Sequence, residues 1–249
     1  MTAAYVTTTV TNNIGYIEFF NPSHNALPSD LLQKLQQSII DAGANDAVKV
    51  LVLQSGGERT FCAGASFDEL KSITDEATGK TFFSGFANVI NAMRKCPKLI
   101  IARVQGKAVG GGVGLIAAAD YCLATTYAAI KLSELSIGIG PFVIAPAIER
   151  KIGVAALSQL TIDCKTFYTP EWCKTKGLYA NVFEDIQTLD TEVATLASEL
   201  VTYNPEGLTA MKQALWNGTE HWDELLVERA QMSGKLVLSD FTKSFLQNF

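Results

Sequence analysis

The feature that most restricts how this chain can fold is a glycine-rich run at residues 106–120, which reads GKAVGGGVGLIAAAD. Gly110, Gly111, Gly112 and Gly114 fall within five positions, and the alanine-rich segment after them predicts a helix. Because each glycine inside a helix or strand costs roughly 0.5–1 kcal/mol, the cluster indicates that the backbone closely approaches another group. A helix N-terminus without side chains presents bare N–H groups to an anion or an oxyanion. The run therefore predicts a site for negative charge.

The composition indicates a globular protein with a large core, since 48% of the 249 residues are hydrophobic and 18% are charged. No apolar run approaches the roughly 18 residues of a membrane span, and no basic and apolar leader is visible. We therefore expect a cytoplasmic protein that does not act at a membrane. The net charge of −5 comes without a basic cluster, which argues against a nucleic-acid partner. Five scattered cysteines and two histidines predict neither disulfides nor a metal site.

The order of predicted elements indicates an α/β fold. Continuous runs of β-branched residues and leucine are typical of buried strands, and they alternate here with glycine-rich exits and helical patterns. A helix is expected to begin at a capping residue within 28–30. The predicted strands lie at residues 5–10, 14–19, 48–53, 98–104, 121–125, 128–132 and 180–183, with a helix at 80–94 and mainly helices after residue 189.

Three interpretations of the glycine run compete. Residues 112–117 fit the dinucleotide fingerprint G-x-G-x-x-A, with Glu134 as a ribose-binding acid, but that fingerprint normally follows the first strand of its fold. Glycines also permit tight packing between a helix and a strand. An oxyanion hole, the third interpretation, needs a second N–H from another turn. Residues 61–70 (FCAGASFDEL) supply such a turn between a predicted strand and a helix, so the two turns together favour the oxyanion hole.

Four segments resemble motifs of the crotonase superfamily, the enoyl-CoA hydratase/isomerase family. Residues 61–70 are similar to its F-x-A-G-A-D-[IL]-x-E-[ML] motif, and residues 106–120 to its G-x-x-x-G-G-G…D motif. Residues 21–27 (NPSHNAL) are similar to N-x-P-x-x-x-N-A-L. Residues 130–138, around Glu134, match the P-E-x-x-[LI]-G region. Because the four motifs occur in the family's order over essentially the whole chain, the chain is identified as a member.

The resemblance implies an α/β, crotonase-like spiral of ββα units with a C-terminal helical region. The spiral core with the acyl-CoA site would cover residues 1–190, and a helical trimerisation region would cover residues 191–249. The implied assembly is a homotrimer or a hexamer built as a dimer of trimers. The implied ligand is an acyl-CoA thioester, so coenzyme A enters as part of the substrate and no separate cofactor is expected.

The resemblance also implies roles for individual residues. The N–H groups of Ala65 and Gly111 would hold the thioester oxygen, and Glu134 would be the catalytic acid and base. The 23–27 turn would lie near the CoA phosphates, and Asp68 stands where the family often has a basic residue near the adenine. The positions implied for substrate binding are Ala63, Asp68, Leu70, His24, Ala26, Gly114 and Phe142.

The chemistry expected of Glu134 follows from its neighbours. Two preorganised N–H donors stabilise a developing oxyanion by on the order of 3 kcal/mol each, which leaves a base to remove the α-proton. Leu132, Leu135 and Ile137 suggest an apolar pocket that would raise the pKa of Glu134 towards neutral pH. The alternative interpretation of Glu134 is a surface or capping carboxylate.

Gly114 narrows the predicted reaction, because it stands where the family's hydratases carry the first of two glutamates. One carboxylate suffices to move a double bond from the 3,4 to the 2,3 position, whereas hydration normally uses two. We therefore predict an enoyl-CoA isomerase. An enoyl-CoA hydratase, for example of a branched enoyl-CoA, and a non-catalytic acyl-CoA-binding subunit are the alternatives. Gly114 is also expected to leave room for a bulkier or polar acyl group.

Overall fold

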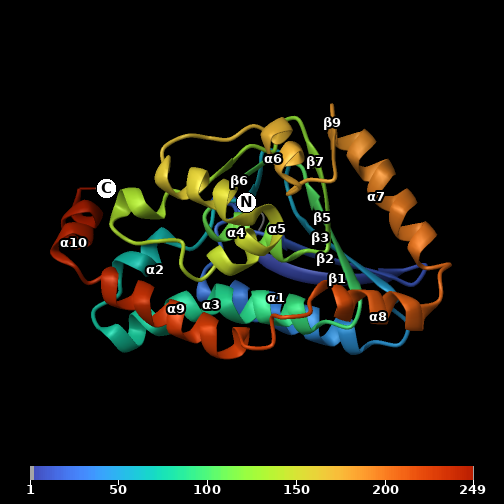
Figure 1. Cartoon of the computed structure of the whole chain (residues 1–249), viewed down its shortest axis with the longest axis horizontal. Coiled ribbons are helices and arrows are strands. Elements are labelled where there is room, and N and C mark those ends of the chain that lie inside the picture. The colour runs from blue at the N-terminus through green and yellow to red at the C-terminus, as the bar shows by residue number, and fades with distance from the viewer. Residues whose placement is uncertain (1–2, 249) are drawn as a thin grey trace.

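The fold contains two sheets, and from β3 onward successive strands alternate between them (Figure 1). The structure is a computed structural model that describes residues 3–248. The six-stranded sheet has the order β1-β2-β3-β5-β7-β9 and is parallel apart from the β1–β2 hairpin. The three-stranded sheet β4-β6-β8 is parallel throughout. The strands are β1 (Tyr5–Thr11), β2 (Ile14–Phe20), β3 (Val50–Ser55), β4 (Thr60–Cys62), β5 (Leu99–Val104), β6 (Lys107–Val109), β7 (Tyr121–Thr125), β8 (Ile130–Lys131) and β9 (Asn181–Phe183).

Each repeat of the chain places one strand in each sheet before its helices follow. The pairs β3 and β4, β5 and β6, and β7 and β8 obey this order, which confirms the predicted α/β spiral of ββα units. The helices are α1 (Ser29–Ala44), α2 (Phe67–Lys71), α3 (Glu76–Lys95), α4 (Gly111–Ala118), the 3₁₀ helix η1 (Glu134–Ile137), α5 (Ala145–Ile162), α6 (Pro170–Lys176), α7 (Ile186–Leu200), α8 (Pro205–Leu215), α9 (Trp222–Leu236) and α10 (Asp240–Gln247).

The large sheet is covered on both faces, as the continuous apolar runs predict. Successive side chains of a strand point to opposite faces. On β3, Leu51 and Leu53 therefore join the main core, whereas Val50 and Val52 join a second cluster beneath α7. Figure 1 shows α7 alongside the sheet, and α1, α3 and α9 as a separate layer of helices.

The first helix begins within the predicted residues, but it is capped differently from the expectation. No side-chain cap is present, because the N-cap residue is Pro28. Instead the carboxylate of Glu69, on α2, accepts hydrogen bonds from Ser29 N (3.0 and 3.1 Å) and from Ser29 Oγ (2.7 Å). A negative group at a helix N-terminus satisfies free N–H donors and interacts well with the helix dipole. This contact ties α1 to the helix that follows the 61–65 turn.

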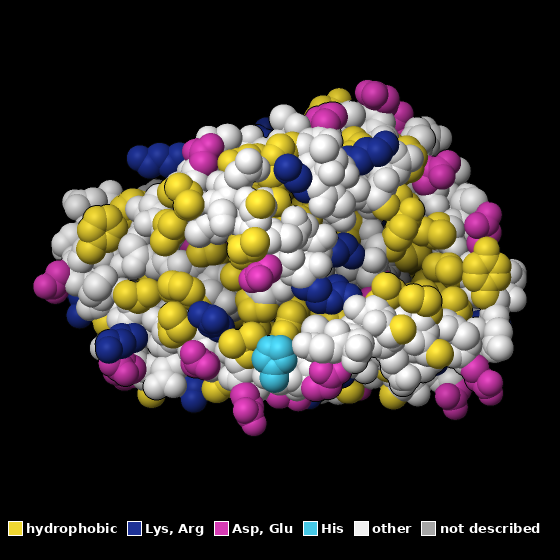
Figure 2. Space-filling model, in the orientation of Figure 1, with side chains coloured by type: hydrophobic (Ala, Val, Ile, Leu, Met, Phe, Trp, Pro, Cys, Tyr) yellow, Lys and Arg dark blue, Asp and Glu magenta, His cyan; other side chains and the backbone are white. Residues whose placement is uncertain are grey.

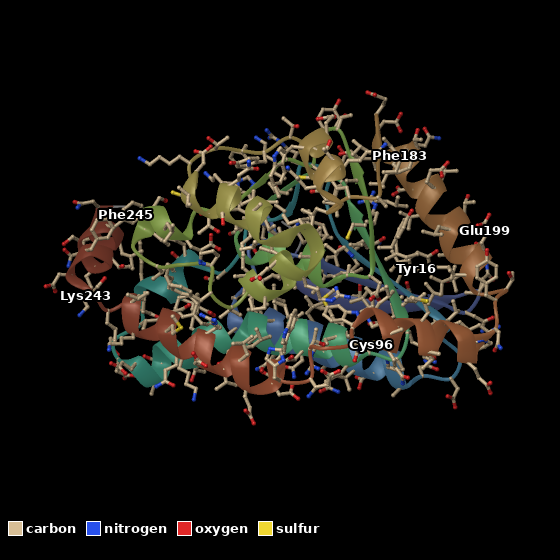
Figure 3. All side chains as sticks on the ribbon, viewed as in Figure 1. Tyr16, Cys96, Phe183, Glu199, Lys243 and Phe245 are labelled. Atoms are coloured by element: carbon tan, nitrogen blue, oxygen red, sulfur yellow. The ribbon has the colours of Figure 1, made fainter. Side chains whose placement is uncertain are left out.

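The helices after residue 190 remain in contact with the core. The predicted boundary at residue 190 falls inside α7, α9 packs along α3, and α10 contacts η1. Figure 3 shows Lys243 and Phe245 of α10 at the opposite end of the molecule from Tyr16 and Phe183. Within residues 3–248, no helix is both long and apolar enough to cross a membrane.

Candidate active site

The small sheet gathers the predicted catalytic segments at one edge. Its strands β4, β6 and β8 are parallel neighbours, so their carboxyl ends meet on the same side. Residues 63–65 follow β4, residues 110–111 follow β6, and residues 133–134 follow β8. Ligand sites of parallel sheets lie outside the carboxyl ends of their strands for this reason. Three segments far apart in the sequence thereby line one pocket.

Two backbone N–H groups at this edge are free to bind an oxyanion. Among the residues that the structure describes, neither Ala65 N–H nor Gly111 N–H has a hydrogen-bond acceptor. Gly64 precedes the first with φ of +92°, and Gly110 precedes the second with φ of +53°, a region that side chains rarely adopt. A Cβ on Gly64 would lie 3.0 Å from Val109 O and 3.6 Å from Gly111 N, so the two turns approach each other closely.

Glu134 faces these turns from the start of η1. A Cβ on Gly110 would lie 2.9 Å from Glu134 Oε1. Any larger residue at position 110 would therefore collide with the carboxylate. The Oε2 atom is buried and has no hydrogen-bond partner within the described part of the chain. Burial raises the pKa of Glu134 to about 7, although backbone hydrogen bonds from Glu134 and Ser133 oppose this rise. At neutral pH the carboxyl group can therefore both accept and release a proton.

The pocket around Glu134 is small and mainly apolar, with a volume of about 130 Å³. Phenyl rings of α3 form one wall and the loop at residues 139–144 forms another. Its polar lining side chains are those of Ser133, Glu134 and Ser233, all other lining residues being apolar or glycine. An apolar pocket with few convergent polar groups is typical of a small-molecule site.

Comparison with known proteins agrees with this geometry. The sequence profile of the enoyl-CoA hydratase/isomerase family matches residues 9–244. The chain belongs to this family, the crotonase superfamily of enzymes. It is 29% identical over 215 residues to the peroxisomal Delta(3,5)-Delta(2,4)-dienoyl-CoA isomerase of Arabidopsis thaliana, covering 80% of this chain and 76% of the relative.

A second relative is a hydratase, and a solved structure has the same fold. The chain is 27% identical over 197 residues to the short-chain-enoyl-CoA hydratase of Clostridium acetobutylicum, covering 79% of this chain and 74% of that one. The crystal structure of an enoyl-CoA hydratase from Bacillus halodurans superposes with a TM-score of 0.90 at 21% identity, covering 98% of this chain and 100% of that one. Hydratases and isomerases both occur among the relatives, so the comparisons establish the family and leave the reaction open.

Of the residues predicted for an acyl-CoA site in this family, six line the pocket and four do not. The six are Ala63, Ala65, Leu70, Gly111, Glu134 and Phe142. Asp68 and His24 are exposed and lie outside the lining.

The turn that contains His24 and Ala26 is nevertheless fixed against the oxyanion segment. Ala63 N donates to His24 O (3.1 Å), and Leu27 N donates to Gly64 O (2.8 Å). The buried Asn25 side chain donates to Gly56 O and Thr60 O, at 2.8 Å each. Ala26 therefore lies beside the pocket wall rather than in it.

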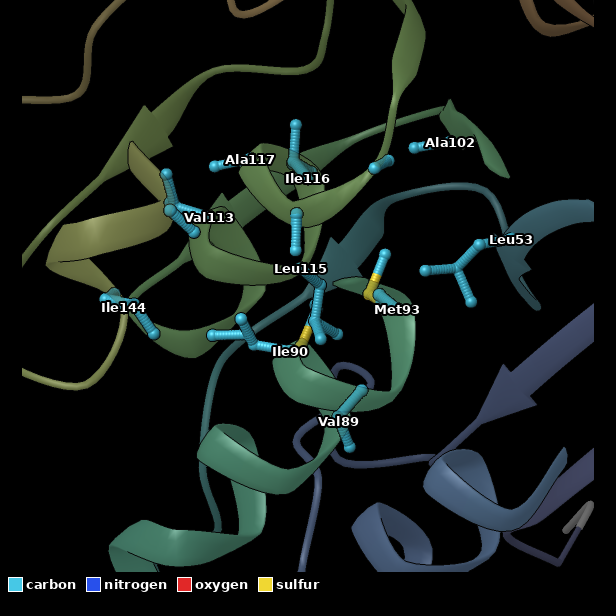
Figure 4. Packing of buried hydrophobic residues seen from close by; sticks show 14 of the residues in the cluster. Leu53, Val89, Ile90, Met93, Ala102, Val113, Leu115, Ile116, Ala117 and Ile144 are labelled. Atoms are coloured by element: carbon cyan, nitrogen blue, oxygen red, sulfur yellow. The ribbon is translucent and has the colours of Figure 1, made fainter. Parts of the chain in front are cut away.

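Gly114 is also outside the lining, and the expectation that it leaves room for a larger acyl group does not hold. It is buried in α4, and a Cβ there would lie 2.7 Å from Ile144 Cβ. Figure 4 shows Ile144 next to Val113 of α4. Ile144 thus occupies the space beside Gly114 and itself lines the pocket.

The sequence interpretation missed the aromatic wall and one hydroxyl group. Phe82, Phe83 and Phe86 all line the pocket from α3, and their spacing by three and four residues was the available signal. Ser233 lines the pocket from α9, and no pattern in the neighbouring sequence predicts this contact. Cys62, beside the first turn, is fully buried, and burial raises the pKa of its thiol to about 12, so it is not a thiolate nucleophile at neutral pH.

Proposed function

We propose that this protein is an enoyl-CoA isomerase that moves a double bond from the 3,4 to the 2,3 position of an acyl-CoA thioester. Glu134 removes a proton from C2, and the electron pair delocalises onto the thioester oxygen and C4. The same carboxyl group then returns the proton to C4, and the 2,3 double bond forms. Atoms and charge balance with no other reactant, so the proposed reaction needs no cofactor beyond the coenzyme A of its substrate.

The observation that carries the proposal is that Glu134 is the one carboxylate among the lining residues. A hydratase normally uses a second acid, and the position beside Gly114 from which one would reach the pocket is filled by Ile144. The pKa of about 7 supports the proposal, because a group that must take and return one proton works best near the ambient pH.

The free N–H groups of Ala65 and Gly111 would stabilise the enolate oxygen. Removing one such donor typically costs about 3–4 kcal/mol of transition-state stabilisation. Both donors belong to the backbone, and Gly111 begins α4, whose dipole adds positive potential at the same point. This arrangement activates the thioester without any ionised donor.

The remaining part of the substrate is assigned to the outer face of the site. We propose that the CoA moiety runs past the turn of His24 and Ala26 and past Asp68 on α2, which lie in or beside the segments that frame the pocket. Asp68 offers a carboxylate there and no positive charge, so the adenine end gains no ionic contact from it.

We also propose that copies of the chain assemble as a homotrimer or as a hexamer. Large apolar side chains remain exposed on α5 and α8, namely Val154 (64% exposed), Met211 (50%) and Leu215 (43%). One contact joins the two helices, because the Arg150 guanidinium of α5 donates to Leu215 O at the end of α8. Figure 2 shows apolar side chains gathered in several places on the face drawn. Burying such surface between copies is favourable.

The test compares 3-enoyl-CoA with 2-enoyl-CoA as substrates for the native protein and for Glu134→Gln. We expect isomerisation of the 3-enoyl ester, and a loss in kcat of about 10²–10⁴-fold in the variant, since the proton carrier is removed. Glu192→Gln, an exposed residue of α7, is the matched control and should keep full activity.

Two other outcomes would contradict the proposal. Water addition to the 2-enoyl ester, without isomerisation, would make the protein a hydratase with a water held by groups other than a second carboxylate. Binding of both esters without turnover would make it a non-catalytic acyl-CoA-binding subunit.

A further inference from the structure

We propose that the acyl group of the substrate is short and uncharged, with about six carbons or fewer. This inference rests on the proposed function, because it assigns the pocket beside Glu134 to the acyl chain. Three features carry it: the volume of the pocket, the packing of its walls and the absence of a positive charge in its lining.

The volume sets the upper limit on the acyl group. The pocket, which is open on one side, has a volume of about 130 Å³. An engineered apolar protein cavity of about 150 Å³ holds one benzene molecule, so this pocket accommodates a group of about six carbons. The thioester carbon C1 and the reacting carbons C2 to C4 must fit within the same space, because Ala65, Gly111 and Glu134 line it. Only about two further carbons can then follow.

The side chains that form the walls cannot easily move apart to admit a longer acyl chain. Ile144 is 3% exposed and fills the space beside Gly114. Phe86 is 6% exposed, and its ring covers the position of a Cβ on Gly111. The half-buried Phe142 ring lies directly over Gly140, since a Cβ there would lie 2.6 Å from its Cε2 atom. Close-packed side chains move only at a cost in free energy, so extra methylenes inserted among them are unfavourable.

The chemistry of the lining excludes an acyl group that ends in a carboxylate. None of the described residues that line the pocket is Lys, Arg or His. A carboxylate brought into this space would lose its hydration without gaining a counter-ion, and it would face the like charge of Glu134. The hydroxyl groups of Ser133 and Ser233 can donate hydrogen bonds but cannot neutralise the charge.

The experiment measures kcat/KM for unbranched 3-enoyl-CoA esters of four, six, eight and ten carbons. For the native protein we expect kcat/KM to fall at least about tenfold between six and ten carbons, as crowding of a packed pocket predicts. Ile144→Ala should recover most of that loss, because it removes three carbons from the wall.

Ile148→Ala is the matched control for this variant. Ile148 is fully buried one turn further along α5 and lies outside the lining, so the same atoms are deleted without opening the pocket. We expect it to lower stability and to leave the chain-length preference unchanged. A six-carbon 3-enoyl-CoA that ends in a carboxylate should react at least about a hundredfold more slowly than its uncharged counterpart in every variant.

The two proposals fail in different ways. If the eight- and ten-carbon esters are isomerised as well as the four-carbon ester, the size limit is wrong and the isomerase proposal stands. If no ester is isomerised, but saturated acyl-CoA esters of four to six carbons bind more tightly than those of ten, the reaction is wrong and the size limit stands. Equal binding of all lengths without turnover would overturn both.

Discussion

Two buried carboxylates in this molecule have opposite environments. Asp120, at the end of α4, accepts hydrogen bonds from Lys212 Nζ at 2.7 and 3.0 Å, from Trp216 Nε1 at 2.7 Å and from Ile100 N at 2.8 Å. Its side chain is 4% exposed and that of Lys212 is 2% exposed. Glu134, in contrast, has an Oε2 atom that is buried without any partner among the described residues.

The difference separates a structural role from a chemical one. A fully paired buried charge is stable only while every partner is present, so Asp120 fixes α8 against β5 and the end of α4. An unpaired buried carboxyl group is costly when ionised, and that cost raises its pKa into the range where proton transfer is useful. A carboxylate thus stabilises the fold at one place and is proposed to transfer a proton at the other.

The largest effect that would test this contrast comes from Lys212→Met. The variant leaves the Asp120 charge buried without its counter-ion, and we expect the free energy of unfolding to fall by about 3–5 kcal/mol. Chemical denaturation measures the loss, with exposed Lys235→Met as the control. A loss below about 1 kcal/mol would show that Asp120 does not depend on this partner.

A pH-dependent stability difference is the next largest effect, and it concerns Glu134. Its pKa lies at about 7 in the folded chain against an ordinary value of 4.5, so the folded chain holds this proton more tightly. The stabilisation that it provides is complete below pH 4.5 and is lost as the pH rises to about 7.

Glu134→Gln removes this dependence. Relative to the native protein, we expect the variant to gain up to roughly 3 kcal/mol of stability between pH 4.5 and pH 8, measured by denaturation at both pH values. Glu228→Gln, exposed on α9, should show no such change. A variant that is equally destabilised at both pH values would mean that Glu134 is paired in solution.

The smallest expected effect comes from Trp216→Phe, which removes one of the donors to Asp120 and keeps an aromatic ring in place. Hydrogen bonds to charged groups contribute about 1.5–3 kcal/mol, so thermal unfolding should show a loss of about 2 kcal/mol. Activity with the proposed substrate should be unchanged, because Trp216 lies outside the pocket. An altered KM would instead link the two carboxylate regions.

Much of the fold was predictable because local patterns and tertiary structure agree. The hairpin, the buried strand at residues 48–53 and the helix at 80–94 appear in the structure as β1–β2, β3 (Val50–Ser55) and α3 (Glu76–Lys95). Their apolar periodicity is imposed by the core that they share. The start of α1 lies within the predicted residues, but its capping was predicted wrongly, because its N-terminus is satisfied by the distant Glu69 rather than by a neighbouring residue.

The candidate site was predictable only where its residues belong to the motif segments. Ala65, Gly111 and Glu134 follow successive strands of one sheet, and their glycine-rich signals are visible in the sequence. The packing of Ile144 against Gly114 joins separate segments, and so does the approach of Ser233 from α9. Such contacts depend on how the helices pack against each other. The spacing of residues within one segment does not predict this packing.

The segments that follow β4, β6 and β8 contribute different groups to the site. Two strand exits contribute peptide N–H groups, which any sequence with the right turn can supply, and the third contributes a side chain, Glu134. In the proposed mechanism the backbone therefore activates the thioester, whereas a few replaceable side chains determine which reaction follows. Mutations of Glu134, or of Ile144 in the same pocket, would then change the fate of the enolate and leave the N–H groups that stabilise it in place.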